Sequence, residues 1–293
     1  MFIIEEEADG CCTTDFCCRV CCNPNHPAIL KMYVATAPIP QAPCACCGIA
    51  CSQPADEAMK DGAAFMTFER PGCCVKLPHC WVCCEMCQDE MKIHAGDVGG
   101  HSGGGGYQMP GSFGDASVVM LGKVPIGGGG CTPTIELFER QAPGVITAET
   151  MDATMGQPFG VVEGPMCFGG CADFCCDTKF TIGNSPGAAD VASIIKKKPE
   201  DCSGWCRACC TPADTYDLKL TESGKEWAPE KKAMMLANMI HLDYMFFEND
   251  KFPVTCEMTE DQTLWITILC CLCYCYGCLI PIQCSIPIKT SKE

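Results

Sequence analysis

Residues 229–248 read PEKKAMMLANMIHLDYMFFE, and this stretch decides the fold. Pro followed by Glu favours a helix start, because Pro fits the first turn and Glu complements the helix dipole. From Ala233 to Phe247 the run is apolar on nearly all sides, so the helix must be buried in protein or in lipid. The run is shorter than the ~20 residues that span a bilayer. The sequence therefore predicts a buried protein helix over 230–247.

The chain before this helix consists mainly of short β-prone segments close to Gly, Pro, Asn or Asp. Examples are Ile29–Thr36, Ala64–Phe68, Val118–Leu121, Phe159–Val162 and Lys179–Ile182. Short strands bounded by turn formers are typical of an all-β barrel or sandwich. A β-barrel that surrounds the helix would satisfy both observations, so we expect one mainly β domain over residues 1–253.

The C-terminal segment, residues 254–293, has a different character. Residues 264–288 contain no charged side chain over 25 positions, which meets the ~20 residues that a transmembrane helix needs. Gly277, Pro281 and Pro287 shorten the uninterrupted run. We predict a membrane-anchoring tail, either as a spanning helix or as a segment at the interface held by acyl chains. Docking into the groove of a partner, or adding a strand to it, is the alternative.

The chain has 36 acidic and 20 basic residues and a formal charge of −16. This balance argues against a nucleic-acid partner, whose phosphates require clustered Lys and Arg. The 32 cysteines offer disulfides, metal sites or lipid attachment. Because Met1–Ile4 is followed at once by three glutamates, we expect no signal peptide and a domain that faces the cytosol or another reducing compartment.

Cysteine pairs two residues apart are half-sites for zinc. Cys80, Cys83, Cys84 and Cys87 form the best candidate set. Reduced cysteines that pack as small apolar residues are the plain alternative, and acylation is a third. We expect no enzyme, because there is no GxSxG motif and no histidine assigned to one particular cysteine.

Three motifs carry a family resemblance. They are Glu69–Cys74 (ERPGCC), Gly164–Cys167 (GPMC) leading to Phe180–Ile182, and Asp243–Glu248 (DYMFFE) at the end of the helix. In this order they resemble the phospholipid scramblases. The resemblance implies a tubby-like fold, a closed antiparallel β-barrel around the central helix, and structural roles for a set of motif residues: Arg70, Pro71, Gly164, Pro165, Asp243, Phe246 and Phe247.

The resemblance also implies membrane phospholipids as partners and palmitate on cysteine pairs. Candidate acylation sites are Cys83, Cys84, Cys270, Cys271, Cys273 and Cys275. The expected function is transbilayer phospholipid movement by a membrane-associated protein. The alternative is a non-enzymatic accessory or scaffold subunit, which uses the barrel to bind partners in a larger membrane protein complex.

The calcium segment of that family departs from its pattern here. The first aspartate of the family motif is replaced by Pro212, which leaves Asp214, Asp217 and Glu222 as candidate calcium ligands. Calcium takes six to eight oxygen ligands, several of them carboxylates. Three carboxylates fall short of this number, so the sequence predicts weakened or lost calcium dependence and favours a solvated acidic turn.

Overall fold

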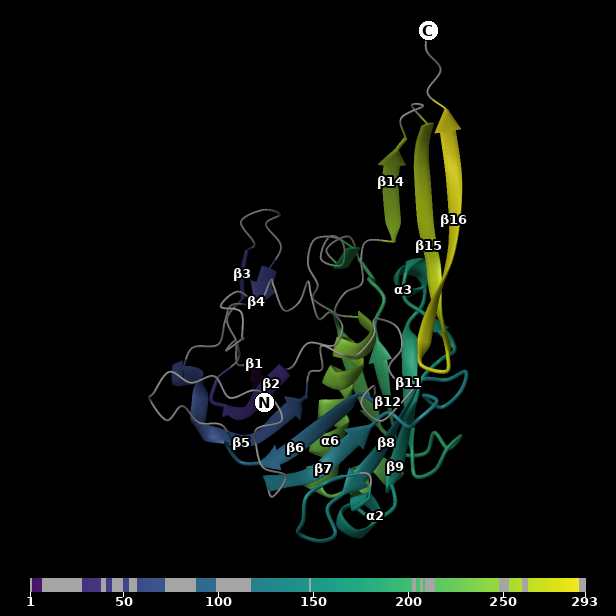
Figure 1. The fold of residues 1–293 in the computed structure, drawn as a ribbon. Helices are drawn as coiled ribbons and strands as arrows, with labels where there is room; N and C mark the ends of the chain where they lie inside the picture. The colour runs from purple at the N-terminus through teal and green to yellow at the C-terminus, as the bar shows by residue number, and fades with distance from the viewer. Residues whose placement is uncertain are drawn as a thin grey trace.

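The largest element is a ten-stranded sheet in which every neighbouring pair is antiparallel (Figure 1). The computed structural model describes residues 2–6, 28–37, 41–43, 50–52, 57–71, 88–98, 117–147, 149–201, 204–205, 208, 214–247, 253–259 and 263–289. In spatial order the strands are β1 (Phe2–Glu6), β2 (Ala28–Ala35), β5 (Lys60–Arg70), β6 (Glu90–Ala95), β7 (Val118–Lys123), β8 (Thr134–Glu139), β9 (Gly160–Glu163), β11 (Thr178–Gly183), β12 (Ala192–Lys196) and β13 (Tyr216–Leu220).

Shorter elements connect and flank this sheet. They are β3 (Gln41–Pro43), β4 (Ala50–Ser52), η1 (Glu57–Met59), α2 (Met151–Thr154), β10 (Cys167–Phe168), α3 (Cys171–Cys175) and α5 (Glu222–Glu226). The main helix is α6 (Pro229–Leu242), and it continues as the π-helical turn η4 (Asp243–Phe247). Three strands follow: β14 (Val254–Met258), β15 (Thr263–Cys275) and β16 (Cys278–Lys289).

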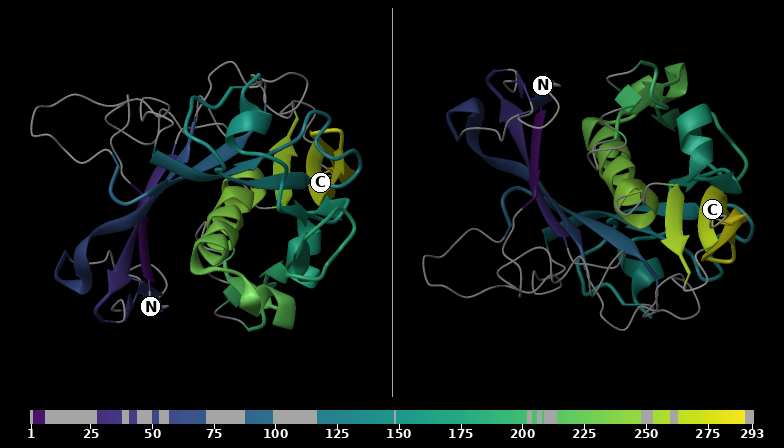
Figure 2. Two further views of the ribbon diagram at one scale, coloured as in Figure 1. Left: turned by 90° about the horizontal axis from the view of Figure 1, so that it is seen from below. Right: turned by 90° about the horizontal axis from the view of Figure 1, so that it is seen from above.

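The predicted central helix is confirmed. Pro229 lies in its first turn, as expected, and Figure 2 shows the strands of the large sheet bending around α6. Met234, Met235 and Ala237 are completely buried in the core. The helix also approaches β7 closely, because a Cβ on Gly122 would lie only 2.9 Å from Oδ1 of Asn238. A side chain at this strand position would push the helix away.

The mainly β fold is confirmed, but the predicted closed barrel is not found. Within the part of the chain that the structure describes, β1 pairs with β2 and β13 pairs with β12, and these two end strands do not pair with each other. The ladder of described strands is therefore open. Local patterns in a sequence specify strands and turns, whereas closure depends on the register between the first and last strands.

The spanning-helix form of the predicted tail is not found, because its described residues form the strands β14, β15 and β16. β15 and β16 make a long antiparallel hairpin with a turn at Tyr276–Gly277, and β14 pairs with the other edge of β15. β10 pairs with the base of β15 as the fourth strand of this sheet, and Figure 1 shows β14, β15 and β16 projecting from the body. Among the described residues, no helix combines the length and apolar character needed to cross a bilayer. The predicted boundary between two domains at residue 253 stays a prediction. Tyr274 of the hairpin belongs to the main core, so the two parts share buried contacts.

Candidate functional site

The projecting sheet has one face without charged or strongly polar side chains. Alternate residues of a strand point to the same side, and residues paired across strands share that side. The registers place Met258, Leu264 and Ile288 in one row, Cys256, Ile266 and Ile286 in the next, and Val254, Ile268 and Cys284 in the third. Past a bulge between Leu269 and Cys271, the same face continues with paired residues: Cys271 and Ile282, Cys273 and Ile280, and Cys275 and Cys278. We call this surface the apolar face.

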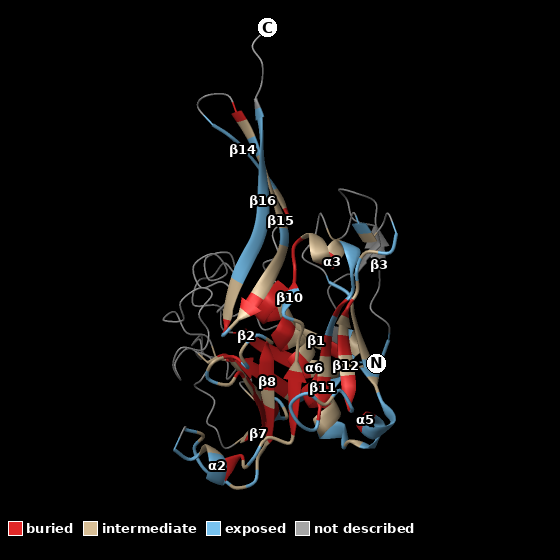
Figure 3. Cartoon of the chain, turned by 90° about the vertical axis from the view of Figure 1, so that its right-hand side faces the viewer, coloured by how far each residue is buried: buried red, intermediate tan, exposed pale blue. Residues whose placement is uncertain are grey.

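The opposite side of the same sheet is mixed and largely polar near its outer end. It carries Thr255, Thr267 and Ser285 in one row and Glu257, Trp265 and Pro287 in the next. The hydroxyls of Thr267 and Ser285 lie 2.8 Å apart and hydrogen-bond to each other. The sheet is thus amphipathic, and β16 is exposed along most of its length (Figure 3).

The base of the hairpin is fixed to the body by specific contacts. The Tyr274 side chain is buried, and its ring meets that of Phe246 edge to face at 6.1 Å. Its hydroxyl donates to the carbonyl oxygen of Gly128 at 2.9 Å, and the Tyr276 amide donates to the Gly130 carbonyl at 2.7 Å. Burial raises the pKa of Tyr274 well above its usual value. The outer part of the sheet therefore projects from a firmly docked base.

The predicted acylation cysteines of the tail lie on or beside the apolar face. Cys270, at the bulge, is exposed, while Cys271, Cys273 and Cys275 are partly exposed. Two further exposed thiols on this face were not predicted: Cys256 and Cys284. The proposed acylation pair Cys83 and Cys84 lies outside the described residues, as does the whole zinc candidate set, Cys80, Cys83, Cys84 and Cys87.

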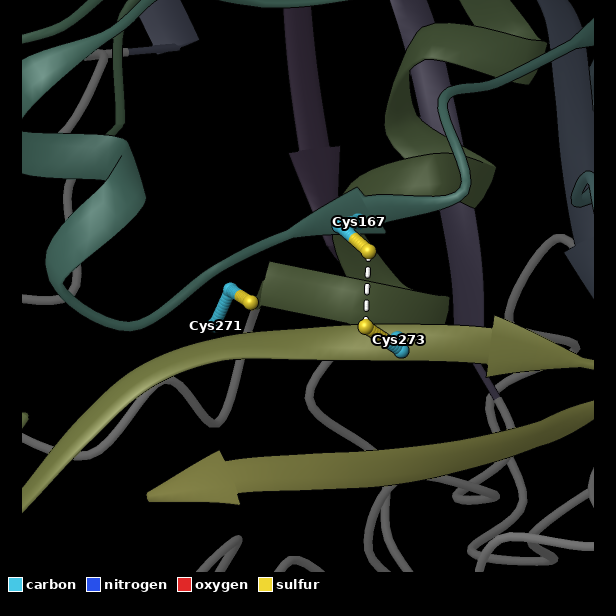
Figure 4. A group of neighbouring side chains, drawn as sticks. All are labelled: Cys167, Cys271 and Cys273. Carbon is cyan, nitrogen blue, oxygen red and sulfur yellow. Dashed lines mark hydrogen bonds between the residues drawn. The ribbon is translucent and has the colours of Figure 1, made fainter. Parts of the chain in front are cut away.

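Three thiols come together where β10 meets β15 (Figure 4). Cys167 lies directly opposite Cys273 in the antiparallel ladder, and their Sγ atoms are 2.6 Å apart. The Sγ atoms of Cys167, Cys271 and Cys273 all lie within 4.8 Å of one another. Hydrogen bonding to the Cys273 thiol, together with burial, raises the pKa of Cys167 to about 11. No local spacing could reveal this group, because Cys167 is 106 residues from Cys273.

The three calcium candidates do not form a common site. Asp214 pairs with Lys196 at 3.0 Å, whereas Glu222 pairs with Lys225 at 2.7 Å on the exposed helix α5. Asp217 lies on strand β13, in register with Ile195. In the described ranges, the three cysteines are the one group of three or more metal-ligating side chains packed this densely.

The buried Lys196 side chain forms ion pairs with two aspartates, Asp173 and Asp214. The Lys196 ammonium lies 3.0 Å from Asp214 and 3.0 Å from Asp173, and 3.9 Å from the centre of the Phe247 ring. Burial raises the pKa of Asp214, an effect that the Lys196 charge partly offsets. The residues present therefore do not fit a calcium ion well, because a fixed cation already neutralises the nearest carboxylates.

Arg70 and Gly164, from the first two motifs of the resemblance, are closely packed against other side chains. Arg70 is buried in an ion pair with Asp89, and Pro71 follows at the end of β5. Gly164, which precedes Pro165, packs so closely that a Cβ there would lie 2.4 Å from the Phe180 ring. Only glycine fits at this position without displacing the aromatic ring.

The last motif, at the end of the helix, closes an aromatic cluster. Asp243 accepts a 2.6 Å hydrogen bond from the Tyr216 hydroxyl. The Phe246 ring packs at 5.1 Å from that of Phe168, and Phe247 packs edge to face with Phe180 at 6.2 Å. These contacts join η4 to β10 and β11, and β10 in turn pairs with β15 of the hairpin.

A known protein family is similar to part of the chain. The Scramblase family model matches residues 149–249, from α2 to just beyond η4. No curated protein and no solved structure matches the chain. The matched region contains the Gly-Pro-x-Cys motif, the central helix and its aromatic end, on which the resemblance was based. It confirms the resemblance found in the sequence: residues 149–249 of this chain are similar to the scramblase family.

Proposed function

We propose that this protein is attached to membranes through the apolar face of its C-terminal sheet and acts there on phospholipids. The observation that carries the proposal is the uncharged face, three strands wide, on a sheet that projects from the body. The family match over residues 149–249 supports a role at lipid bilayers.

The strength of this attachment can be estimated from the isoleucines of β16. Ile280, Ile282, Ile286 and Ile288 are 44–50% exposed. Full burial of such a side chain contributes about 1.5–3 kcal/mol, so four half-exposed ones contribute about 3–6 kcal/mol before any ordering cost. A single myristoyl chain gives marginal binding of similar size. The apolar contact alone thus gives weak, reversible binding, and acyl chains on the exposed thiols Cys256 and Cys284 of the same face would convert it into stable anchoring.

The prolines of β16 favour a lipid surface over an added protein strand. Pro281 and Pro287 lie in β16, which pairs with β15 alone among the described strands. Proline cannot donate to a ladder, and natural edge strands use it to prevent pairing with other chains. In addition, the net charge of −16 disfavours docking on anionic lipid by electrostatics. Apolar contact is then the mode of attachment that remains compatible with the surface.

Paired lysine substitutions on opposite faces test the attachment. Ile266→Lys with Ile286→Lys places two charges at directly paired positions of the apolar face, and Thr267→Lys with Ser285→Lys does the same on the other face. We expect the unacylated protein and the polar-face variant to float with phosphatidylcholine vesicles, and the apolar-face variant to remain unbound. Equal flotation of both variants, or equal loss of both, would contradict the proposal.

The finer function we propose is transbilayer phospholipid movement without a requirement for calcium. The family supports the lipid substrate, and the Lys196 ion pairs support the loss of calcium dependence. Vesicles with a fluorescent phospholipid in both leaflets, reduced from outside only, measure such movement. We expect the fraction of reduced lipid to exceed one half, with the same rate in calcium and in chelator. A fraction fixed at one half would instead favour the accessory-subunit function.

A further inference from the structure

We propose that Cys167, Cys271 and Cys273 form a thiolate site for a soft d10 metal ion, Cu(I) or Zn(II), which clamps the C-terminal hairpin to the body of the protein. The site differs from the zinc site suggested by the sequence, which involves other cysteines. It does not depend on the proposed membrane function.

The backbone positions the three sulfurs before any ion binds. Cys167 and Cys273 are a directly opposed pair in the ladder between β10 and β15, and Cys271 lies two residues before Cys273 on the same side of β15. Figure 4 shows the Cys167 and Cys273 side chains pointing toward one another, with that of Cys271 beside them. The sulfur atoms lie within 4.8 Å of one another. Sulfurs bound to one tetrahedral zinc ion at ~2.3 Å are separated by a little under 4 Å. The Sγ atoms of Cys167 and Cys273, which are 2.6 Å apart, must therefore move apart when an ion binds between them.

The surroundings also select a soft ion. The donor group contains sulfur alone, and thiolates favour Cu(I) and Zn(II) over the hard ions that carboxylates bind. The site is partly open to solvent, since Cys167 is exposed and the other two are partly exposed. An ion can therefore enter, and a solvent molecule can complete a tetrahedral zinc site. Binding converts three thiols to thiolates and releases three protons, with no change in the oxidation state of sulfur.

Such an ion would join two parts of the chain that are far apart in sequence. Cys167 belongs to the region matched by the family, and Cys271 and Cys273 belong to the hairpin that follows it. The β10–β15 pairing is only two residues long, so a metal bridge here would add to the Tyr274 contacts that already dock the base of the hairpin. A metal bridge would fix the angle at which the apolar face projects.

The test measures the reactivity of each cysteine by mass spectrometry in the full chain, purified under reducing, oxygen-free conditions. Alkylation by N-ethylmaleimide is followed without metal, with Cu(I) supplied as its acetonitrile complex, and with zinc chloride. Metal-bound sulfur is a poor nucleophile, so we expect Cys167, Cys271 and Cys273 to be protected together, by about tenfold or more. Cys256 lies on the same face but outside the group and provides the comparison.

Single substitutions distinguish a shared ion from simpler explanations. Cys271→Ser should restore the reactivity of Cys167 and Cys273 in the presence of metal, while Cys256→Ser should leave their protection unchanged. X-ray absorption of the loaded protein should lose sulfur ligands in Cys271→Ser but not in Cys256→Ser. A disulfide between Cys167 and Cys273, with Cys271 still reactive, overturns the proposal. Full reactivity of all three thiols toward N-ethylmaleimide in the presence of Cu(I) and of zinc overturns it as well.

Discussion

The Arg70 guanidinium donates from Nε and Nη2 to the two carboxylate oxygens of Asp89, and the side chains of both residues are almost completely buried. Nε2 of His241, on the central helix, lies 3.1 Å from the same carboxylate. The arginine of the Arg-Pro motif thus connects β5, the segment before β6 and α6. This arrangement gives the motif a structural role that its sequence alone does not explain.

Removing one member of this pair should destabilise the fold strongly. Asp89→Ala leaves a buried guanidinium without its carboxylate, and breaking a buried ion pair in this way costs about 3–5 kcal/mol. Glu222→Ala breaks the exposed pair with Lys225 and should change the free energy of unfolding by less than about 0.5 kcal/mol. Urea unfolding followed by circular dichroism measures both. Similar values for the two variants would contradict a stabilising role for the buried pair.

The Asp243 carboxyl should make stability depend on pH. Burial raises its pKa above the usual 3.8, although the Tyr216 hydrogen bond opposes this shift. The folded state therefore holds the proton more tightly than the unfolded state, so this contribution is complete below pH ~4 and is lost as pH rises through the folded pKa. Asp243→Asn replaces the titrating carboxyl by a neutral amide, so the variant does not lose this stability as pH rises. We expect the stability of the variant relative to the wild type to increase from pH 4 to pH 7.

The Tyr216 hydroxyl provides the matched variant for this titration. Tyr216→Phe removes the bond that lowers the Asp243 pKa, so the pH dependence should become steeper rather than flatter. Unfolding midpoints in urea across this pH range measure both variants. A parallel pH profile for wild type and Asp243→Asn would show that Asp243 does not titrate differently on folding.

Calcium sensitivity should appear only when Lys196 is replaced. In the wild type the ammonium compensates Asp173 and Asp214, so ~1 mM calcium should leave the melting temperature unchanged. Lys196→Gln leaves these carboxylates uncompensated, which should lower the melting temperature and let calcium restore part of the loss. Lys197→Gln, which affects an outer pair with Asp177, should remain insensitive to calcium. A calcium response of the wild type would reverse this interpretation.

Two glycines of one turn separate backbone strain from close packing at the hairpin base. Gly128 and Gly130 both have positive φ, but only a Cβ on Gly128 would collide, at 2.2 Å from the Tyr274 hydroxyl oxygen. Gly128→Ala should displace Tyr274 and make the hairpin more sensitive to protease. Gly130→Ala meets no atom within 4 Å and should cost only the ~1 kcal/mol of backbone strain. Equal cleavage of both variants would mean that the contact does not fix the hairpin.

The sequence by itself determined the central helix, the mainly β character and the resemblance to the scramblases. These features depend on local information: the Pro-Glu start and apolar run of α6, the short strands bounded by turn formers, and the DYMFFE motif at its end. Such patterns act over a few residues, so they can be read from one chain. The uncharged character of residues 264–288 was also evident, but its conformation was not, because a continuous apolar run suits a helix and a strand equally.

Only the tertiary structure decided how the tail folds. The registers between β14, β15 and β16 separate its side chains into an apolar and a polar face, and a shift of one residue would exchange them. Long-range pairing likewise places Cys167 against Cys273 and surrounds Lys196 with Asp173 and Asp214. These contacts join residues that are far apart in the chain, and their spacing leaves no periodic trace in the sequence. The register between strands therefore determines which cysteines and charged side chains meet in this protein, whereas local sequence patterns determine its core helix and strands.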